Sequence, residues 1–150
     1  MKLKVRACSE KIGGEIPLPA YATEGSAGLD LRACIEEAVT LPVGGRALIP
    51  TGIAIELPGA ETVALVFARS GLAIRHGLAL ANGVGVIDSD YRGEIKVGLI
   101  NQGAEAYTIQ PGERIAQLAV LPVLQPEIEL VQSLSETERG AGGFGSTGTK

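Results

Sequence analysis

Apolar and polar residues alternate in short runs along most of the chain. Residues 94–100 place Ile95, Val97 and Leu99 on one side of an extended segment. Similar short runs recur at residues 2–7, 39–41, 53–57, 62–67, 78–81, 107–109, 114–123 and 128–131. Glycine and proline turns separate them, so the pattern predicts about a dozen short strands in an all-β sandwich, jelly roll or barrel. Only residues 71–76 are suited to a helical turn or two.

The run at residues 114–123 differs from the others because it is apolar on both faces. A strand of this kind is covered on both sides, and a small β domain rarely achieves that alone, so we interpret the run as an oligomer contact. Gln117 lies inside it, where an amide needs hydrogen-bond partners. Its side chain either bonds neighbouring backbone or points into a polar site.

Residues 83–95 combine a strand pattern with a polar turn. Val84, Val86 and Ile87 lead into the turn at residues 88–90, and a new strand pattern begins at residue 94. This predicts a β-hairpin whose backbone groups can bind a flat polar ring, with Asp88 placed to draw a proton from water. Asp and Ser also favour ordinary turns, so these residues alone leave both interpretations open.

The character of the chain changes after residue 131. Residues 132–150 contain only Leu134 and Phe144 as large apolar side chains, together with five glycines. Such a segment does not fold by itself. We therefore expect a β domain over residues 1–131 and a flexible arm over residues 132–150. The arm is either a plain disordered end or, with Arg139, Ser146 and Thr147, a cradle for an anion.

Composition narrows the function further. The 150 residues suffice for one domain with its own core, and the net charge of -4 argues against nucleic acid as a partner. Cys8 and Cys34 have no metal-site or redox spacing, which favours two buried free thiols. No run reaches membrane-spanning length and the N-terminus lacks a signal-peptide core, so we expect a cytoplasmic protein without membrane partners.

Five segments, in order, resemble the trimeric dUTP pyrophosphatase (dUTPase) family. They are Ala-Gly-Leu-Asp-Leu at 27–31, Arg-Ser-Gly-Leu-Ala at 69–73, Asn82 through Gly93, Gly-Glu-Arg-Ile-Ala-Gln-Leu at 112–118, and the glycine-rich segment 139–148. Ala68 stands where the family commonly has Pro. The resemblance implies a distorted jelly-roll subunit with one short helix, in a homotrimer whose active sites are shared between subunits.

The resemblance also implies a reaction: Mg²⁺-assisted hydrolysis of dUTP to dUMP and pyrophosphate, which limits uracil in DNA and supplies dUMP for thymidylate synthesis. Asp88 would hold and deprotonate the water that attacks the α-phosphorus. Asn82 and the backbone near Val86 and Ile87 would bind uracil without room for a 5-methyl group. Tyr91 would exclude a ribose 2′-hydroxyl, and Lys96 is a further implied substrate-binding residue.

The phosphates require donors from other segments. Arg69, Ser70 and Gly71 would supply them at the start of the helical turn, and Gln117 would reach the α-phosphate or a metal-bound water. Asp30 would orient the metal's waters or a phosphate-binding arginine; an ordinary strand-end acid is the alternative. Mg²⁺ would be held mainly by phosphates and waters. From the arm, the implied contacts are Arg139, Phe144 over the uracil, Gly145, Ser146 and Thr147.

Two other functions are compatible with the same fold. In dCTP deaminase, a relative, a deaminating glutamate falls where Gly98 stands here, so cytosine deamination lacks its acid–base group. A β-rich trimeric binding module without catalysis is the second alternative. The joint presence of Asp88, Arg69, Gln117 and Arg139 argues against it.

Overall fold

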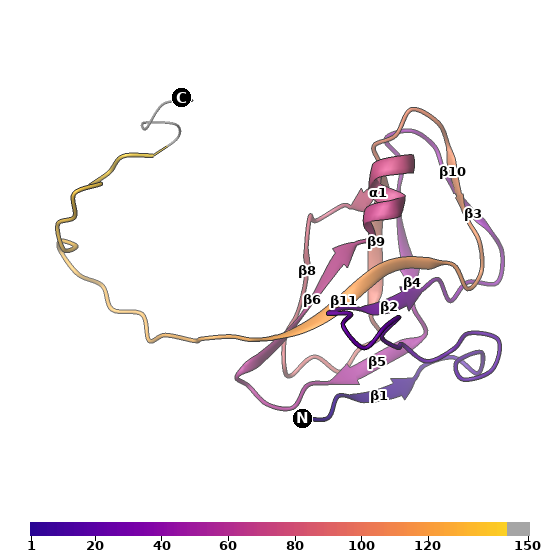
Figure 1. Ribbon diagram of the computed structural model, residues 1–150, viewed down its shortest axis with the longest axis horizontal. Coiled ribbons are helices and arrows are strands. Elements are labelled where there is room, and N and C mark those ends of the chain that lie inside the picture. The colour runs from indigo at the N-terminus through magenta and orange to yellow at the C-terminus, as the bar shows by residue number, and fades with distance from the viewer. Residues whose placement is uncertain (144–150) are drawn as a thin grey trace.

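The computed structural model describes residues 1–143 and consists of strands in small sheets plus one short helix in this range (Figure 1). The elements are β1 (Lys4–Ala7), β2 (Leu29–Arg32), β3 (Val39–Leu41), β4 (Arg46–Pro50), β5 (Ile53–Glu56), β6 (Thr62–Ala68), α1 (Ser70–His76), β7 (Leu78–Leu80), β8 (Gly85–Ile87), β9 (Lys96–Asn101), β10 (Tyr107–Ile109) and β11 (Arg114–Pro122). The predicted all-β class with a single short helix is confirmed.

Every pairing between these strands is antiparallel, and most join segments far apart in the sequence. The largest sheet has the order β2-β11-β6-β8, a second has the order β4-β9-β7, and β1 pairs with β5 and β3 with β10. The core lies between these sheets. Its fully buried side chains include Leu31, Leu41, Ile49, Leu78, Leu99, Ile109, Ile115 and Leu118. Each contributes roughly 1.5–3 kcal/mol of hydrophobic stabilisation.

Asn101 is a polar side chain inside this core, with an exposed fraction of 0%. Its amide group donates to the carbonyls of Leu41 (2.9 Å) and Glu105 (2.8 Å), and its side-chain oxygen accepts from the Gly103 N–H (2.9 Å). All three bonds connect the end of β9 to neighbouring segments. The burial of the amide is therefore compensated, because each of its polar atoms is bonded.

The helix α1 begins directly after β6 and ends at Gly77. Gly77 has φ +70°, the left-handed conformation that terminates many helices, and its N–H bonds the Ala73 carbonyl at 3.0 Å. A Cβ at this position would also collide with the backbone of Gly103. Glycine is thus required both by conformation and by close packing. The α1 helix, seven residues long, is too short to cross a membrane, and residues 1–143 contain no longer one.

The predicted β-hairpin at residues 83–95 is wrong in its pairing. Strand β8 pairs with β6, whereas β9 pairs with β4 and β7. The eight residues between Ile87 and Lys96 let the two strands diverge instead of bonding each other. Residues 88–95 therefore form a loop that joins two different sheets.

Three other predictions need correction. Residues 128–131 form no strand, and Ile128 and Leu130 are 95% and 98% exposed. Strands β2 and β4 were not predicted, and the cysteines are not buried: Cys8 is exposed and Cys34 half-buried. The oligomer contact expected at residues 114–123 stays a prediction: Ile115, Ala116 and Leu118 of β11 are buried within the single chain, whereas the far end of the strand is less covered. Its exposed end at Leu121 is the part still free for a contact.

Candidate active site

A cavity of about 230 Å³ opens between the diverging strands β8 and β9. Six of the predicted site residues line it: Asn82, Val86, Ile87, Asp88, Tyr91 and Lys96. The sequence interpretation missed the rest of the wall, which includes Val66, Leu80, Glu94, Ile95, Val97 and Gly98. The alternation of residues 94–100 could have indicated part of it, because the strand's backbone forms one side of the cavity.

The cavity has an apolar floor and a polar rim. Ile87, Ile95 and Val97 are buried, whereas Asn82 and Asp88 are exposed. This arrangement suits a small planar ring with a polar edge, since the floor provides apolar contact and the rim provides hydrogen bonds.

The loop after β8 holds Asp88 and Tyr91 in fixed positions. The Tyr91 N–H donates to the Asp88 carbonyl at 3.2 Å, and the Tyr91 hydroxyl donates to the Glu94 carbonyl at 3.0 Å. A Cβ on Gly93 would collide with the Tyr91 hydroxyl, so a larger residue at this position would displace the ring. The Asp88 carboxylate is left exposed at the rim, open to water.

Glu94 anchors the other end of this loop. Its Oε1 accepts the Gly52 N–H at 2.9 Å, and its Oε2 lies 3.9 Å from Lys96 Nζ. The next residue, Ile95, accepts a hydrogen bond from the Thr51 hydroxyl at 2.6 Å. The loop is therefore fixed to the turn between β4 and β5.

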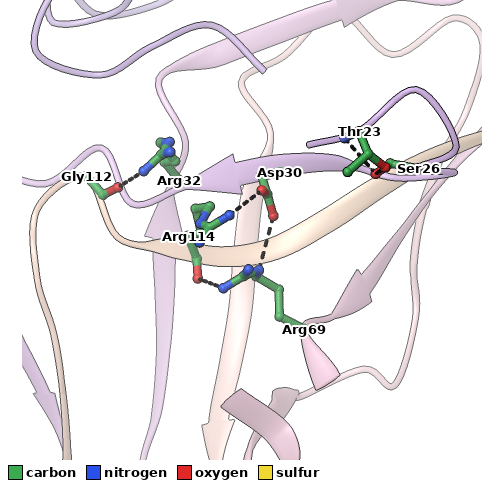
Figure 2. A network of polar contacts seen from close by, with 7 residues as sticks. All are labelled: Thr23, Ser26, Asp30, Arg32, Arg69, Gly112 and Arg114. Atoms are coloured by element: carbon green, nitrogen blue, oxygen red, sulfur yellow. Dashed lines mark hydrogen bonds and ion pairs between the residues drawn. The ribbon is translucent and has the colours of Figure 1, made fainter. Parts of the chain in front are cut away.

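A second group of predicted residues surrounds the end of β6 (Figure 2). Asp30 on β2 places Oδ1 3.1 Å from Arg69 Nε and Oδ2 3.1 Å from Arg114 Nη1. Arg69 Nη1 also donates to the Arg114 carbonyl at 3.3 Å. One carboxylate thus holds two guanidinium groups, and the group of three keeps a net positive charge beside the start of α1, where Ser70 and Gly71 lie exposed.

Gln117 belongs to this second group. It is opposite Asp30 on β2 and opposite Phe67 on β6, and its Nε2 donates to the Ala68 carbonyl at 3.1 Å. The first of the two interpretations of this amide, bonding to neighbouring backbone, is what the structure shows. A Cβ on Gly28 would stand 3.0 Å from Gln117 Oε1, so the glycine leaves room for that oxygen.

The two groups do not meet within one chain. Ile87, next to Asp88, pairs with Ala64, which precedes Arg69 by five residues. Five residues of strand span about 17 Å. The cavity that contains Asp88 accordingly includes none of Arg69, Ser70, Gly71 and Gln117.

Arg139 lies in neither group. It is part of the extended segment that leaves the sheets after β11 (Figure 1), and its Nε donates to the Gly142 carbonyl at 2.9 Å. Phe144, Gly145, Ser146 and Thr147 lie outside the described residues. His76, at the end of α1, packs against Tyr107 with ring centroids 4.9 Å apart.

Comparisons with known proteins identify the family. The dUTPase family model matches residues 14–148. The deoxyuridine 5′-triphosphate nucleotidohydrolase of Hahella chejuensis is 56% identical over 148 residues, covering 99% of this chain and 97% of the relative, and that of Salmonella typhimurium is 50% identical over 149 residues, covering 99% of each. The solved dUTPase of Staphylococcus bacteriophage 80alpha with dUpNHpp has a TM-score of 0.86 at 28% identity and covers 98% of both chains. The chain therefore belongs to the dUTPase family.

Proposed function

We infer that this protein is a dUTP diphosphatase, which hydrolyses dUTP to dUMP and pyrophosphate. Relatives at 50–56% identity over nearly the whole chain carry the name of this enzyme. The observation that carries the inference is the cavity between β8 and β9, which has an apolar floor and an exposed Asp88 carboxylate at its rim. A nucleobase in the cavity would have its 5′-phosphates directed past this carboxylate.

Base and sugar are selected by the cavity's shape. The backbone of Val86 and Ile87 and the amide of Asn82, which line the cavity, offer hydrogen bonds to the edge of uracil. The close approach of this backbone to the ring would exclude a 5-methyl group. The Tyr91 ring, held by the Glu94 carbonyl, contacts the deoxyribose where a 2′-hydroxyl would clash. Lys96 lies at the same rim and adds positive charge. These contacts favour dUTP over dTTP and UTP.

Asp88 acts as the base. Its carboxylate is exposed at the rim, so it can accept a proton from a bound water while that water attacks the α-phosphorus. The bond between the α-phosphorus and the bridging oxygen breaks, and pyrophosphate leaves with its electron pair. The positions of water and phosphate decide the rate, because little covalent chemistry is left to the protein.

The phosphate chain requires donors that the same subunit does not provide near Asp88. Arg69, Ser70, Gly71 and Gln117 form such a donor group, but the register of β6 separates it from Asp88 by about 17 Å along the strand. A site that contains both groups must combine two copies of the chain. We therefore propose a homotrimer in which the cavity of one subunit faces the arginine group of the next.

The exposed apolar side chains that follow β11 are consistent with this assembly. Leu124, Ile128, Leu130 and Leu134 are each more than 85% exposed in the isolated chain. Burial against a neighbour would remove this apolar surface from water. Within the proposal, residues 132–150 form the arm that closes over a neighbour's site, where Arg139, Ser146 and Thr147 bind the γ-phosphate and Phe144 with Gly145 covers the uracil.

The residues of the candidate site are compatible with a Mg²⁺ ion that is held mainly by the substrate. Residues 1–143 contain no group of three or more His, Cys, Asp or Glu side chains placed to hold a metal. Both Asp30 oxygens face arginines, which favours the arginine-orienting role over direct contact with the metal's waters, and Gln117 Oε1 remains able to face such a water. When bound to the triphosphate, the ion would neutralise phosphate charge.

The expected cytoplasmic location and the absence of nucleic-acid partners belong to the same proposal.

Pyrophosphate release from dUTP, dTTP, dCTP and UTP tests the function. We expect turnover of dUTP with much lower kcat/KM for the other three nucleotides. Ammonia release from dCTP would instead support the deaminase alternative, although Gly98, which lines the cavity, has no side chain to act as the acid–base group. Binding of dUTP without turnover would support the non-catalytic module.

A further inference from the structure

Arg92 lies in the loop that carries Asp88 and Tyr91, but on the side away from the cavity. It lines a separate hollow of about 440 Å³ together with Lys4, Arg6 and Glu56 from strands β1 and β5. The cavity between β8 and β9 does not include it. Arg92 is therefore close to the two proposed functional side chains without sharing their surface.

The guanidinium of Arg92 holds the backbone of this loop together. Its Nη1 donates to the Ser89 carbonyl at 2.7 Å and to the Tyr91 carbonyl at 3.0 Å. These two carbonyls flank Asp90, and the adjacent Tyr91 N–H closes the turn on the Asp88 carbonyl at 3.2 Å. Hydrogen bonds from a charged donor are stronger than those between neutral groups, so Arg92 stabilises one particular shape of residues 88–91.

The same residue fixes the loop to the strand pair β1–β5. Arg92 Nε lies 4.0 Å from Glu56 Oε2, and the Arg92 carbonyl accepts from Arg6 Nη2 at 3.2 Å. Glu56 is itself held by Lys4, with Nζ 2.6 Å from Oε1. Residues 88–92 are thus connected to a part of the molecule that lies outside the two sheets flanking the cavity.

We propose that Arg92 is a positioning residue for dUTP hydrolysis. By fixing the Ser89 and Tyr91 carbonyls, it sets where the Asp88 carboxylate and the Tyr91 ring stand relative to a bound nucleotide. The inference rests on the proposed function. A carboxylate displaced by about 1 Å loses a large part of its effect on rate, and a displaced Tyr91 ring discriminates less against a 2′-hydroxyl. Loss of Arg92 therefore lowers both kcat and sugar selectivity.

Steady-state kinetics of Arg92→Gln and Arg92→Lys with dUTP and UTP test this role. For Arg92→Gln we expect kcat for dUTP to fall about tenfold or more, with KM changed less than about threefold, and the ratio of kcat/KM for dUTP over UTP to fall at least about threefold. Arg92→Lys, which keeps a charged donor, should recover part of both. Lys2→Gln is the matched control, because it removes an equal charge from an exposed position just before β1 and leaves the Lys4–Glu56–Arg92 contacts in place.

The selectivity ratio separates positioning from general stability. A variant that is only less stable has fewer active molecules, which lowers both rates equally and leaves the ratio unchanged. An unchanged ratio or a parental kcat in Arg92→Gln would overturn the proposal. If Arg92→Gln does not fold, Glu56→Gln is measured instead. The proposal then requires the ratio of kcat/KM for dUTP over UTP to fall at least about twofold, and an unchanged ratio would overturn it. Failure of the unmodified protein to hydrolyse dUTP would instead refute the proposed function itself.

Discussion

The Asp30 carboxylate on β2 pairs with the Arg69 guanidinium at the end of β6, with Oδ1 and Nε 3.1 Å apart. The pair crosses β11, which lies between the two strands, and the second carboxylate oxygen holds Arg114. Asp30 thus determines how the two guanidinium groups of Arg69 and Arg114 are oriented (Figure 2).

Replacement of Asp30 by Asn should reduce activity more than stability. The amide keeps the volume but loses the charge that orients both arginines, so we expect kcat/KM for dUTP to fall about 10- to 100-fold. Arg32→Gln is the control, since Arg32 lies on the same strand and bonds the Gly112 carbonyl instead. A parental kcat/KM in Asp30→Asn, measured by pyrophosphate release, would show that the arginines need no carboxylate to orient them.

Replacement of Asp88 by Asn should separate binding from chemistry. The amide is isosteric but a very weak base, so hydrolysis should slow by roughly 10²-fold or more while dUTP still binds. Calorimetric titration with a non-hydrolysable dUTP analogue measures the binding, and pyrophosphate release measures the rate. Turnover near the parental rate would mean that another group deprotonates the water.

The assembly prediction concerns the mass of the protein in solution. Because the Asp88 cavity and the Arg69 group do not meet in one chain, we expect a stable homotrimer with no appreciable folded monomer. Light scattering should give three times the chain mass at micromolar concentration. A fully active monomer at that concentration would contradict the shared site.

Truncation after Ser135 should leave the oligomer folded and remove most of the activity. Ordering about a dozen arm residues costs on the order of 10 kcal/mol or more, so we expect the arm to become ordered only with a dUTP analogue and Mg²⁺, and not with dUMP. Protection from proteolysis measures this ordering. Phe144→Ala should cost less activity than the truncation, since phosphate contacts survive it. An active truncated protein would show that the arm is a plain disordered end.

Tyr107 gives a prediction about alkaline pH. Burial and the hydrogen bond to Glu113, with the two oxygens 2.5 Å apart, raise the pKa of Tyr107 to about 12 from 10.0. Folding therefore favours the neutral phenol. Its contribution to the free energy of unfolding is fully present below pH 10 and is lost as the pH rises toward 12. Tyr107→Phe should cost about 1 kcal/mol of unfolding free energy at pH 8.

Urea unfolding at several pH values measures this difference. The gap between the parent and Tyr107→Phe should be constant from pH 7 to pH 9 and should shrink between pH 10 and pH 12. The exposed Tyr21 provides a control in Tyr21→Phe, which should show no such trend. A gap that widened with pH would mean that the phenolate, not the phenol, is favoured in the folded state.

The sequence by itself determined the features that depend on neighbouring residues. The alternation of residues 94–100 placed Ile95, Val97 and Leu99 inside, as observed, because side-chain direction in a strand follows directly from its period of two. The helical turn after Arg69 was also predicted from the sequence. The ordered segments from Ala27 to Gly148 indicated the dUTPase family, which the comparisons then confirmed.

Strand pairing was decided only by the tertiary structure. Strand β8 was expected beside its sequence neighbour β9, but it pairs with β6, because the eight-residue loop allows either choice and long-range packing selects one. Strands β2 and β4 were missed, and residues 128–131 alternate well but form no strand within one chain. Alternation predicts that a segment can be a strand, while the presence of a partner decides whether it becomes one.

The same distinction applies to the site. The sequence indicated which residues are candidates for the chemistry, since carboxylate, guanidinium and amide groups are recognisable in any fold. Their distances were not contained in it: the sheet order β2-β11-β6-β8 brings Asp30, Gln117 and Arg69 together and leaves Asp88 farther along β6. The strand register decides which groups share one site, because it sets the distances between residues on neighbouring strands. The register itself is fixed only when the whole core packs.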